Sequence, residues 1–165
     1  MTTAPIVEKR SSNRPYLAIH TKVKMQDIPS VLPPLIFEVT DWLKENNIPA
    51  DGIAFFHYKS MNEDCSELDT AVGILTPASA TGNDRITTGA FPAGNYATLI
   101  YIGDYKNMKE GHMALDGWIK QNNLKEKHTR SASGVEWGGR TEFYLSEPGS
   151  NPEECRTEVA FLLED

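Results

Sequence analysis

The chain has 165 residues and a net charge of −7, and 39% of its residues are hydrophobic. These values fit one globular domain that buries its own core. Lys and Arg are scattered along the chain, which argues against nucleic acid as a direct partner, because such binding depends on neutralised phosphates. No apolar run is long enough to cross a bilayer, and Met1 to Arg10 lacks a signal-peptide pattern, so we expect a cytoplasmic protein with no membrane contact.

Two amphipathic helices are predicted in chain order, the first from Ser30 to Asn47 and the second from Asp104 to Asn123. Ser30 and Asp104 are expected as their N-caps. Apolar residues recur every three or four positions in both segments, which is typical of one buried helix face. In the first segment they are Leu32, Leu35, Ile36, Val39, Trp42 and Leu43, and in the second Tyr105, Met108, Leu115, Trp118 and Ile119.

The two helices end alike. The segment from Trp42 to Ile48 reads WLKENNI, and the segment from Trp118 to Leu124 reads WIKQNNL, 76 positions later. Tryptophan, lysine and both asparagines stay in register. We interpret this match as the trace of an internal duplication.

The flanking strands support the duplication. Phe56-His57-Tyr58 aligns with Phe143-Tyr144-Leu145, and Val72 aligns with Val159, both at a spacing of 87 positions. Tyr16 to Ile19 matches Tyr96 to Leu99 more loosely. We predict eight strands, with one repeat over about residues 5–76 and the other over about 85–163. The fold class is α+β: two pseudo-symmetric strand–helix–strand–strand repeats, antiparallel sheets with one long helix each, and a ligand cleft between the repeats of a single domain over residues 1–165.

The spacing between repeats rises from 76 at the helix ends to 87 at the hairpins. The second repeat therefore has 11 extra residues, and they fall within Lys125 to Arg140. This segment is rich in Ser, Gly and charge, and long loops of this kind often cover functional sites. We expect it to pass over the cleft and to bring Trp137 onto a bound molecule, although Trp137 packing on its own domain is the alternative. Trp42 and Trp118 are expected in the core.

Several segments together resemble the GyrI-like, or AraC-type, effector-binding family. They are Phe91 to Ala97, Tyr101 to Tyr105, the helix that carries Trp118, Glu142 to Leu145, and Thr157 to Val159. The similarity runs from about Val7 to the C-terminus. It implies the duplicated fold described above and a small-molecule ligand. Because it begins so early, we expect a stand-alone member without a DNA-binding module.

Glu142 is the main candidate site residue. It begins a predicted strand with apolar neighbours, so its carboxylate is expected to be buried in the cleft, to line the main pocket and to have too few protein partners, with a pKa raised by burial. The resemblance implies that a glutamate here meets cationic or polar ligands. The alternative is a structural acid held by backbone amides or by Arg140. If the site is functional, Glu142→Gln should weaken binding and leave the fold intact or slightly more stable.

Four further residues complete the candidate ligand site. Tyr144 lies two positions beyond Glu142 on the same strand face, and His57 is its predicted counterpart in the first repeat. Both could instead form a half-buried pair at a sheet edge. Tyr101 and Tyr105 flank Gly103, at a turn that the resemblance places near the cleft mouth. For Tyr105 a core position in the second helix is the favoured alternative.

The sequence indicates no metal and no cofactor. The four histidines are dispersed, and neither Cys65 nor Cys155 lies at metal-ligand spacing. There is no phosphate-binding glycine loop and no Gly-x-Ser-x-Gly elbow.

Three functions remain open. The leading one is a stand-alone protein that binds a hydrophobic, aromatic or cationic small molecule. The second is a hydrolase of reactive electrophiles such as cyclopropanoid compounds, with Glu142 as the base and Tyr101 or Tyr144 as the acid. The third is a protein inhibitor of a topoisomerase, for which the modest negative charge is weak support.

Overall fold

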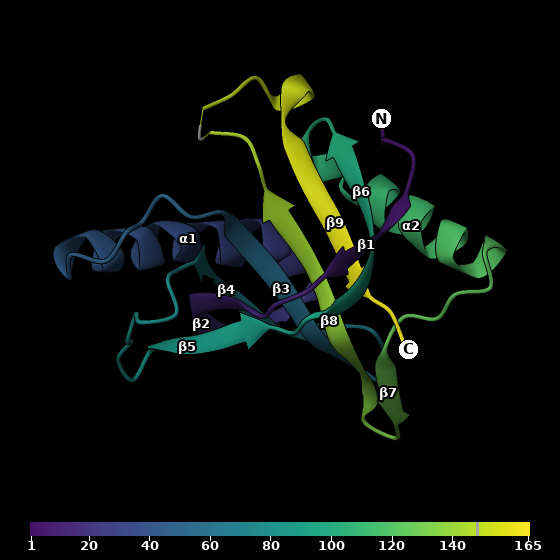
Figure 1. The fold of residues 1–165 in the computed structure, drawn as a ribbon, viewed down its shortest axis with the longest axis horizontal. Coiled ribbons are helices and arrows are strands. Elements are labelled where there is room, and N and C mark those ends of the chain that lie inside the picture. The colour runs from purple at the N-terminus through teal and green to yellow at the C-terminus, as the bar shows by residue number, and fades with distance from the viewer. Residues whose placement is uncertain (148) are drawn as a thin grey trace.

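The computed structural model describes residues 1–147 and 149–165. There it shows two α-helices on one face of a single curled, nine-stranded antiparallel sheet (Figure 1). The strands are β1 (Ile6–Arg10), β2 (Arg14–Lys24), β3 (Ala54–Asn62), β4 (Glu67–Leu75), β5 (Ile86–Phe91), β6 (Gly94–Ile102), β7 (His128–Ser131), β8 (Gly134–Tyr144) and β9 (Arg156–Leu162). The helices are α1 (Ile28–Glu45) and α2 (Lys109–Gln121), with short 3₁₀ helices η1 (Met25–Asp27), η2 (Tyr105–Asn107) and η3 (Pro152–Glu154).

The strand order confirms the duplicated fold. It runs β1-β6-β9-β8-β3-β4-β2-β5. If β5, β6, β8 and β9 are the second copies of β1, β2, β3 and β4, this order is symmetric about the contact between β8 and β3. The first strand of each repeat crosses to the other half, because β1 pairs with β6 and β5 pairs with β2. This exchange joins the two repeats into one sheet with shared cores. The ninth strand, β7, is absent from the prediction of eight and pairs only with β8.

The helix ends agree in detail with the predicted duplication. Asn46 and Asn122 each donate a side-chain hydrogen bond to a tryptophan carbonyl four residues back, at 2.9 and 2.8 Å. Asn47 and Asn123 both have a φ of 56°, the left-handed conformation that ends a helix in a Schellman motif. The amide of Ile48 then bonds the carbonyl of Leu43, just as Leu124 bonds Ile119.

The helix starts differ from the prediction. The first helix begins at Ile28, and the Ser30 hydroxyl donates to the carbonyl of Asp27 instead of capping the helix. Pro33 and Pro34 therefore lie beyond its first turn. Asp104 does act as a cap, but it caps η2, and α2 begins only at Lys109.

The register of one hairpin strand was predicted wrongly by one residue. Phe56 pairs with Glu142, and Phe55 pairs with Phe143. Phe56 packs under α1, whereas Phe143 packs on the opposite face of the sheet. Both helices lie on the same face, so equivalent residues must share a face. The sequence offset between equivalent residues of β3 and β8 is therefore 86. Phe56 is then the counterpart of Glu142, and Tyr58 is the counterpart of Tyr144. Strands β4 and β9 keep the predicted offset of 87.

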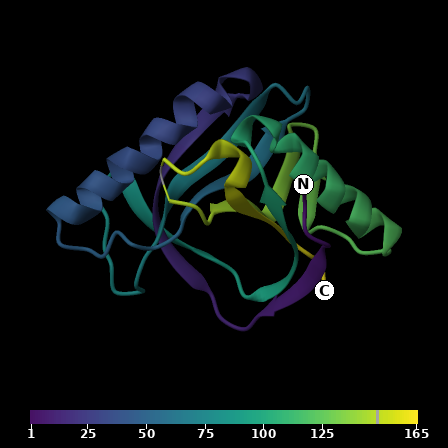
Figure 2. The same cartoon turned by 90° about the horizontal axis from the view of Figure 1, so that it is seen from above.

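The sheet is buried on both faces. Figure 2 shows both helices on one side of the sheet, which curls around on its other side. On the helix side, α1 and α2 each cover a cluster of aliphatic and aromatic residues. Inside the curl, a further cluster is formed by Tyr16, Ala18, Phe55, Ala71, Phe91, Tyr96, Phe143, Ala160 and Leu162. The rings of Phe55, Phe91 and Phe143 meet one another at centroid distances of 4.9 to 6.1 Å.

The 11 extra residues of the second repeat form a hairpin rather than a loop. They make β7 and lengthen the start of β8, where His128 pairs with Trp137. The ring of Trp137 packs against the cluster under α1, and one guanidinium, that of Arg140, lies 4.5 Å from its centroid. The segment is therefore a paired hairpin and not the expected loop, and Trp137 packs on its own domain, as the alternative had it. Trp137 is nevertheless on the same face of the sheet as Glu142.

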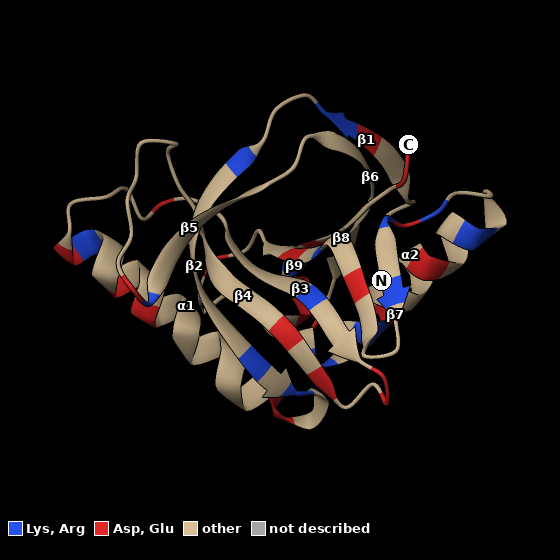
Figure 3. Ribbon diagram, turned by 90° about the horizontal axis from the view of Figure 1, so that it is seen from below, with Lys and Arg blue, Asp and Glu red and all other residues tan. Residues whose placement is uncertain are grey.

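The surface carries mixed charge. Figure 3 shows acidic and basic residues interspersed on both helices. Within the part of the chain that the structure describes, neither helix combines the length and the apolar character that a membrane crossing requires.

Candidate functional site

A single carboxylate lies at the centre of the helix face of the sheet. The strand pairings place Glu142 in one row across the sheet, and every other member of the row is apolar. In spatial order, the row is Ile19, Val72, Phe56, Glu142, Val159 and Leu99. Glu142 is only 6% exposed, as predicted. A charge at this position needs partners, because an isolated buried carboxylate is strongly unfavourable.

Three side chains supply those partners. The Tyr144 hydroxyl donates to Oε1 of Glu142 at 2.7 Å, and the Tyr58 hydroxyl donates to Oε2 at 2.9 Å. Nε2 of His112 on α2 lies 2.7 Å from the same Oε2. The expectation that Glu142 lacks protein partners is therefore wrong. Its partners are also not the backbone amides or Arg140 of the alternative, since Arg140 bonds Glu126 and Asp116.

The partners reverse the predicted direction of the pKa shift. Burial by itself raises the pKa of Glu142, but the hydrogen bond and the charge of His112, with the bonds from Tyr144 and Tyr58, outweigh burial and hold the pKa below its ordinary value. Burial and the nearby carboxylate raise the pKa of both tyrosines well above 10. The site at neutral pH is therefore one carboxylate that accepts from two neutral phenols.

Aromatic rings surround the carboxylate. The Phe56 ring meets the Tyr144 ring edge-on at 5.0 Å, and the Tyr105 ring meets the other side of Tyr144 at 5.5 Å. His112 lies between the rings of Tyr58 and Phe161, at centroid distances of 5.9 and 5.6 Å. Rings offer both apolar contact area and attraction for a cation at their faces. A negative charge enclosed by such rings is suited to an organic cation.

Two of the predicted site residues lie beside Glu142. Tyr144 is half-buried and bonded to it, in a strand between β3 and β9 rather than at a sheet edge. Tyr105 is 45% exposed, so the favoured alternative, a core position in the second helix, is wrong. Burial and the thiol of Cys155 raise the pKa of Tyr105 to about 12. Thr157 lies across from Tyr144, and its buried Oγ1 has no partner among the described residues.

His57 and Tyr101 lie elsewhere. His57 pairs with Thr141, and the alternation of strand side chains puts both on the face opposite Glu142. Its true counterpart is Phe143, so it cannot bring a polar group to the site. Tyr101 is 2% exposed, packs under α2, and donates its hydroxyl to the carbonyl of Asp104 at 3.3 Å.

Sequence reasoning missed two of the residues that contact Glu142. Tyr58 would have followed from the correct spacing of 86, which makes it the counterpart of Tyr144. His112 had no such signal. It lies on a helix 30 residues away from Glu142, and only the packing of α2 on the sheet brings them together.

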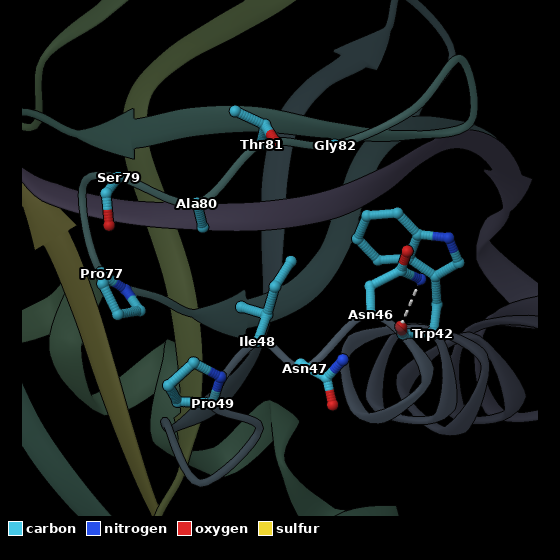
Figure 4. Close-up of a pocket in the computed structure, with 10 residues that line it drawn as sticks. All are labelled: Trp42, Asn46, Asn47, Ile48, Pro49, Pro77, Ser79, Ala80, Thr81 and Gly82. Carbon is cyan, nitrogen blue, oxygen red and sulfur yellow. Dashed lines mark hydrogen bonds between the residues drawn. The ribbon is translucent and has the colours of Figure 1, made fainter.

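A clear surface cavity lies at a different place. It has a volume of about 360 Å³ and lies between the end of α1 and the connector between the repeats (Figure 4). Trp42, Asn46, Ile48, Pro77 and Thr81 are among its walls. Glu142 does not line it, so this cavity gives no support to the expectation that the carboxylate lines the main pocket. At Glu142 itself, Tyr58, Tyr144 and His112 are in direct contact with the carboxylate.

Metal binding has no support at this site. Among residues 1–147 and 149–165, no three His, Cys, Asp or Glu side chains lie close enough to hold an ion. Of the described residues that contact Glu142, His112 is the one with a metal-binding side chain, and the other two are Tyr58 and Tyr144.

Comparison with known protein families assigns the class of this duplicated fold. The model of the GyrI-like small molecule binding domain matches residues 5–164. The chain belongs to the GyrI-like family. No curated protein sequence matches it.

Solved structures share the fold at low sequence identity. The C-terminal domain of EcmrR is 15% identical with a TM-score of 0.72, and the match covers 98% of each chain. SAV2435, solved bound to tetraphenylphosphonium, is 10% identical with a TM-score of 0.65 over 98% of this chain and 94% of its own. A hydrolase from Listeria innocua is 14% identical with a TM-score of 0.59 over 97% and 91%.

Proposed function

We propose that this protein binds organic cations with aromatic groups, and that Glu142 is the residue that pairs with their charge. The observation that supports the proposal is an ionised carboxylate, 6% exposed, at the centre of an apolar sheet row and enclosed by aromatic rings. The equivalent position in the other repeat is Phe56, so the duplicated framework does not by itself call for a charge at this point of the sheet. The structural likeness to SAV2435, which was solved with tetraphenylphosphonium, adds support.

Tyr144 and Tyr105 complete the proposed contact surface. Tyr105 is the more exposed ring, and it stands edge-on to Tyr144, which in turn bonds Glu142. A ligand entering past Tyr105 meets aromatic surface first and the carboxylate at the end. Thr157 lies across from Tyr144, and its buried Oγ1, which has no partner among the described residues, would offer a further hydrogen bond.

Titration calorimetry with tetraphenylphosphonium tests the proposal. Triphenylphosphine oxide, which has similar rings and no net charge, serves as the matched control ligand. The cation should bind at neutral pH and the oxide much more weakly. Glu142→Gln should reduce affinity for the cation by about tenfold or more, which is the loss of about 1.4 kcal/mol or more of charge pairing.

A matched protein control is available on the same strand. Glu136 is an exposed acid of β8, so Glu136→Gln makes the same charge change away from the site. It should leave the affinity unchanged. Equal losses in both variants would mean that net charge, and not the buried site, governs binding, and the proposal would be rejected.

A second function, hydrolysis of a reactive electrophile, is favoured by one observation. Glu142 contacts two phenols at 2.7 and 2.9 Å, so a carboxylate and two O–H donors meet at one point. A carboxylate that orients water beside a phenol that polarises a leaving group is a plausible acid–base pair. Here Tyr144 or Tyr58 takes the acid role, because Tyr101 is bonded to the carbonyl of Asp104.

Chromatography of products from strained-ring electrophiles such as cyclopropanoid compounds tests this second function. Turnover should require Glu142 and fall sharply in Tyr144→Phe, while cation binding by that variant persists. Turnover that survives Glu142→Gln would exclude this mechanism.

A further inference from the structure

One of the three donors to Glu142 differs from the other two. Tyr58 and Tyr144 come from the central strands β3 and β8, which are held by pairing on both sides. His112 comes from α2, and its side chain is 19% exposed. The next residue along α2, Met113, is 62% exposed. Tyr144 is also half-buried, but His112 is the partly exposed donor that a helix, and not a central strand, supplies.

The imidazole of His112 has the chemistry expected of a ligand. It is a flat aromatic ring able to carry positive charge, its Nε2 contacts Oε2 of Glu142 at 2.7 Å, and it lies between the rings of Tyr58 and Phe161. An aromatic organic cation attracted to the same carboxylate would occupy the same space beside these rings. The protein thus fills its own site with a group that resembles the proposed ligand.

The carboxylate is already surrounded by three side chains. Oε1 accepts from Tyr144, and Oε2 accepts from Tyr58 and contacts His112, so a ligand that comes into contact with the buried Glu142 must displace one of them. Displacing Tyr58 would leave a buried hydroxyl unsatisfied, since Tyr58 is 7% exposed. Displaced His112 can instead rotate toward water, which restores its hydrogen bonds.

The helix itself has little freedom to approach the sheet more closely. Gly111 lies against it so tightly that a Cβ at this position would be 3.2 Å from the Cβ of Tyr101 and 3.4 Å from Val159. Because the backbone of α2 is in contact already, rotation of the His112 side chain is the simplest way to exchange the donors of Glu142.

We infer that His112 is a built-in partner of Glu142 that competes with ligands for the carboxylate and thereby selects aromatic cations over neutral molecules. The inference rests on the function proposed above. A ligand must supply at least as good a partner to the carboxylate as the imidazole, which is already in place and loses no translational freedom. Neutral aromatic molecules do not meet that requirement.

Two substitutions at His112 with opposite effects test the inference. His112→Ala removes the competitor and should tighten tetraphenylphosphonium binding about tenfold in titration calorimetry. His112→Lys supplies a competitor that keeps its charge and should weaken binding relative to the wild type. Met113→Ala, at the neighbouring exposed position, is the control and should change the affinity less than twofold. Thermal unfolding of each variant confirms that it is folded.

The outcomes separate this inference from the proposed function. In one outcome, Glu142→Gln abolishes binding and His112→Ala leaves it unchanged or weakens it. This result overturns the competitor role of His112 and leaves the proposed function intact. Such a result would make His112 part of the contact surface for the ligand. If neither the wild type nor His112→Ala binds tetraphenylphosphonium, both the proposed function and this inference fail. Binding by His112→Ala alone supports both.

Discussion

Phe56 and Glu142 are paired residues on the two central strands of the sheet, and they occupy equivalent positions in the two repeats. The pseudo-two-fold axis therefore passes between an aromatic ring and a carboxylate. Their symmetry-related neighbours Tyr58 and Tyr144 both turn their hydroxyls to the one acid that is present. The duplicated framework thus supplies two donors, and a single difference between the repeats supplies the charge.

Removing the charge of Glu142 should destabilise the protein without ligand. Glu142→Gln replaces an acceptor of three donors by an amide, and charge-assisted hydrogen bonds contribute about 1.5–3 kcal/mol each before compensation. We expect a loss of about 1–3 kcal/mol in the free energy of unfolding, measured by urea denaturation. The expectation from the sequence alone was unchanged or slightly higher stability. Higher stability would show that desolvation of the carboxylate outweighs its three bonds.

The two phenols should be energetically coupled. Tyr58→Phe and Tyr144→Phe each remove one donor, raise the pKa of Glu142, and should each cost about 1.5–3 kcal/mol. Because both act on one carboxylate, the double variant should deviate from additivity by more than about 0.5 kcal/mol. Tyr96→Phe is the control, since its hydroxyl donates to the backbone carbonyl of Pro92 at 2.7 Å and not to a charge. Strict additivity would argue against a shared acceptor.

The equivalent helix ends should respond equally to mutation. Asn47 and Asn123 have the same left-handed φ of 56°, which alanine adopts at a cost of about 1–2 kcal/mol. Asn47→Ala and Asn123→Ala should therefore destabilise the protein by similar amounts, and Asn→Gly at either position should have little effect or a small stabilising one. Thermal unfolding of the four variants checks the prediction. A strong effect at only one position would mean that the two caps are not equivalent.

His57 should make the fold sensitive to acid. Burial first, and then the charges of Lys59 and His20, lower its pKa from 6.5 to about 3, and its two ring nitrogens have no hydrogen-bond partner among the described residues. The unfolded chain binds a proton near pH 6.5 while the folded protein does not, so stability falls as the pH drops from about 6.5 toward 3. Between pH 6.5 and pH 4 the loss is on the order of 3 kcal/mol.

Urea denaturation as a function of pH measures this contribution. His57→Phe removes the titrating group and should flatten the profile between pH 6.5 and pH 4. His128→Ala, at an exposed position of β7, should keep the wild-type slope. An unchanged slope in His57→Phe would locate the acid sensitivity in another group. Glu142 adds a separate loss of stability, which begins near its ordinary pKa of 4.5 and continues as the pH falls through its lowered pKa in the folded protein.

Local sequence patterns determined the elements and the duplication. The repeated WLKENNI and WIKQNNL segments predicted both helix ends, because a helix stop is decided by a few neighbouring residues and their backbone conformation. Apolar periodicity predicted both helices, and the apolar neighbours of Glu142 predicted a buried strand. The hairpin register was missed by one residue, since the matching letters Phe56 and Phe143 face opposite sides of the sheet.

Tertiary structure alone decided how Glu142 is used. Its three partners come from β3, from β8 and from α2, and sequence separations of 84 and 30 residues carry no local signal for the contacts with Tyr58 and His112. The direction of the pKa shift depends on those partners, because burial and hydrogen bonding act in opposite directions and only the packed structure sets their balance. The sequence by itself placed a carboxylate in the core, and the packing of α2 on the sheet determined that it stays ionised and already paired.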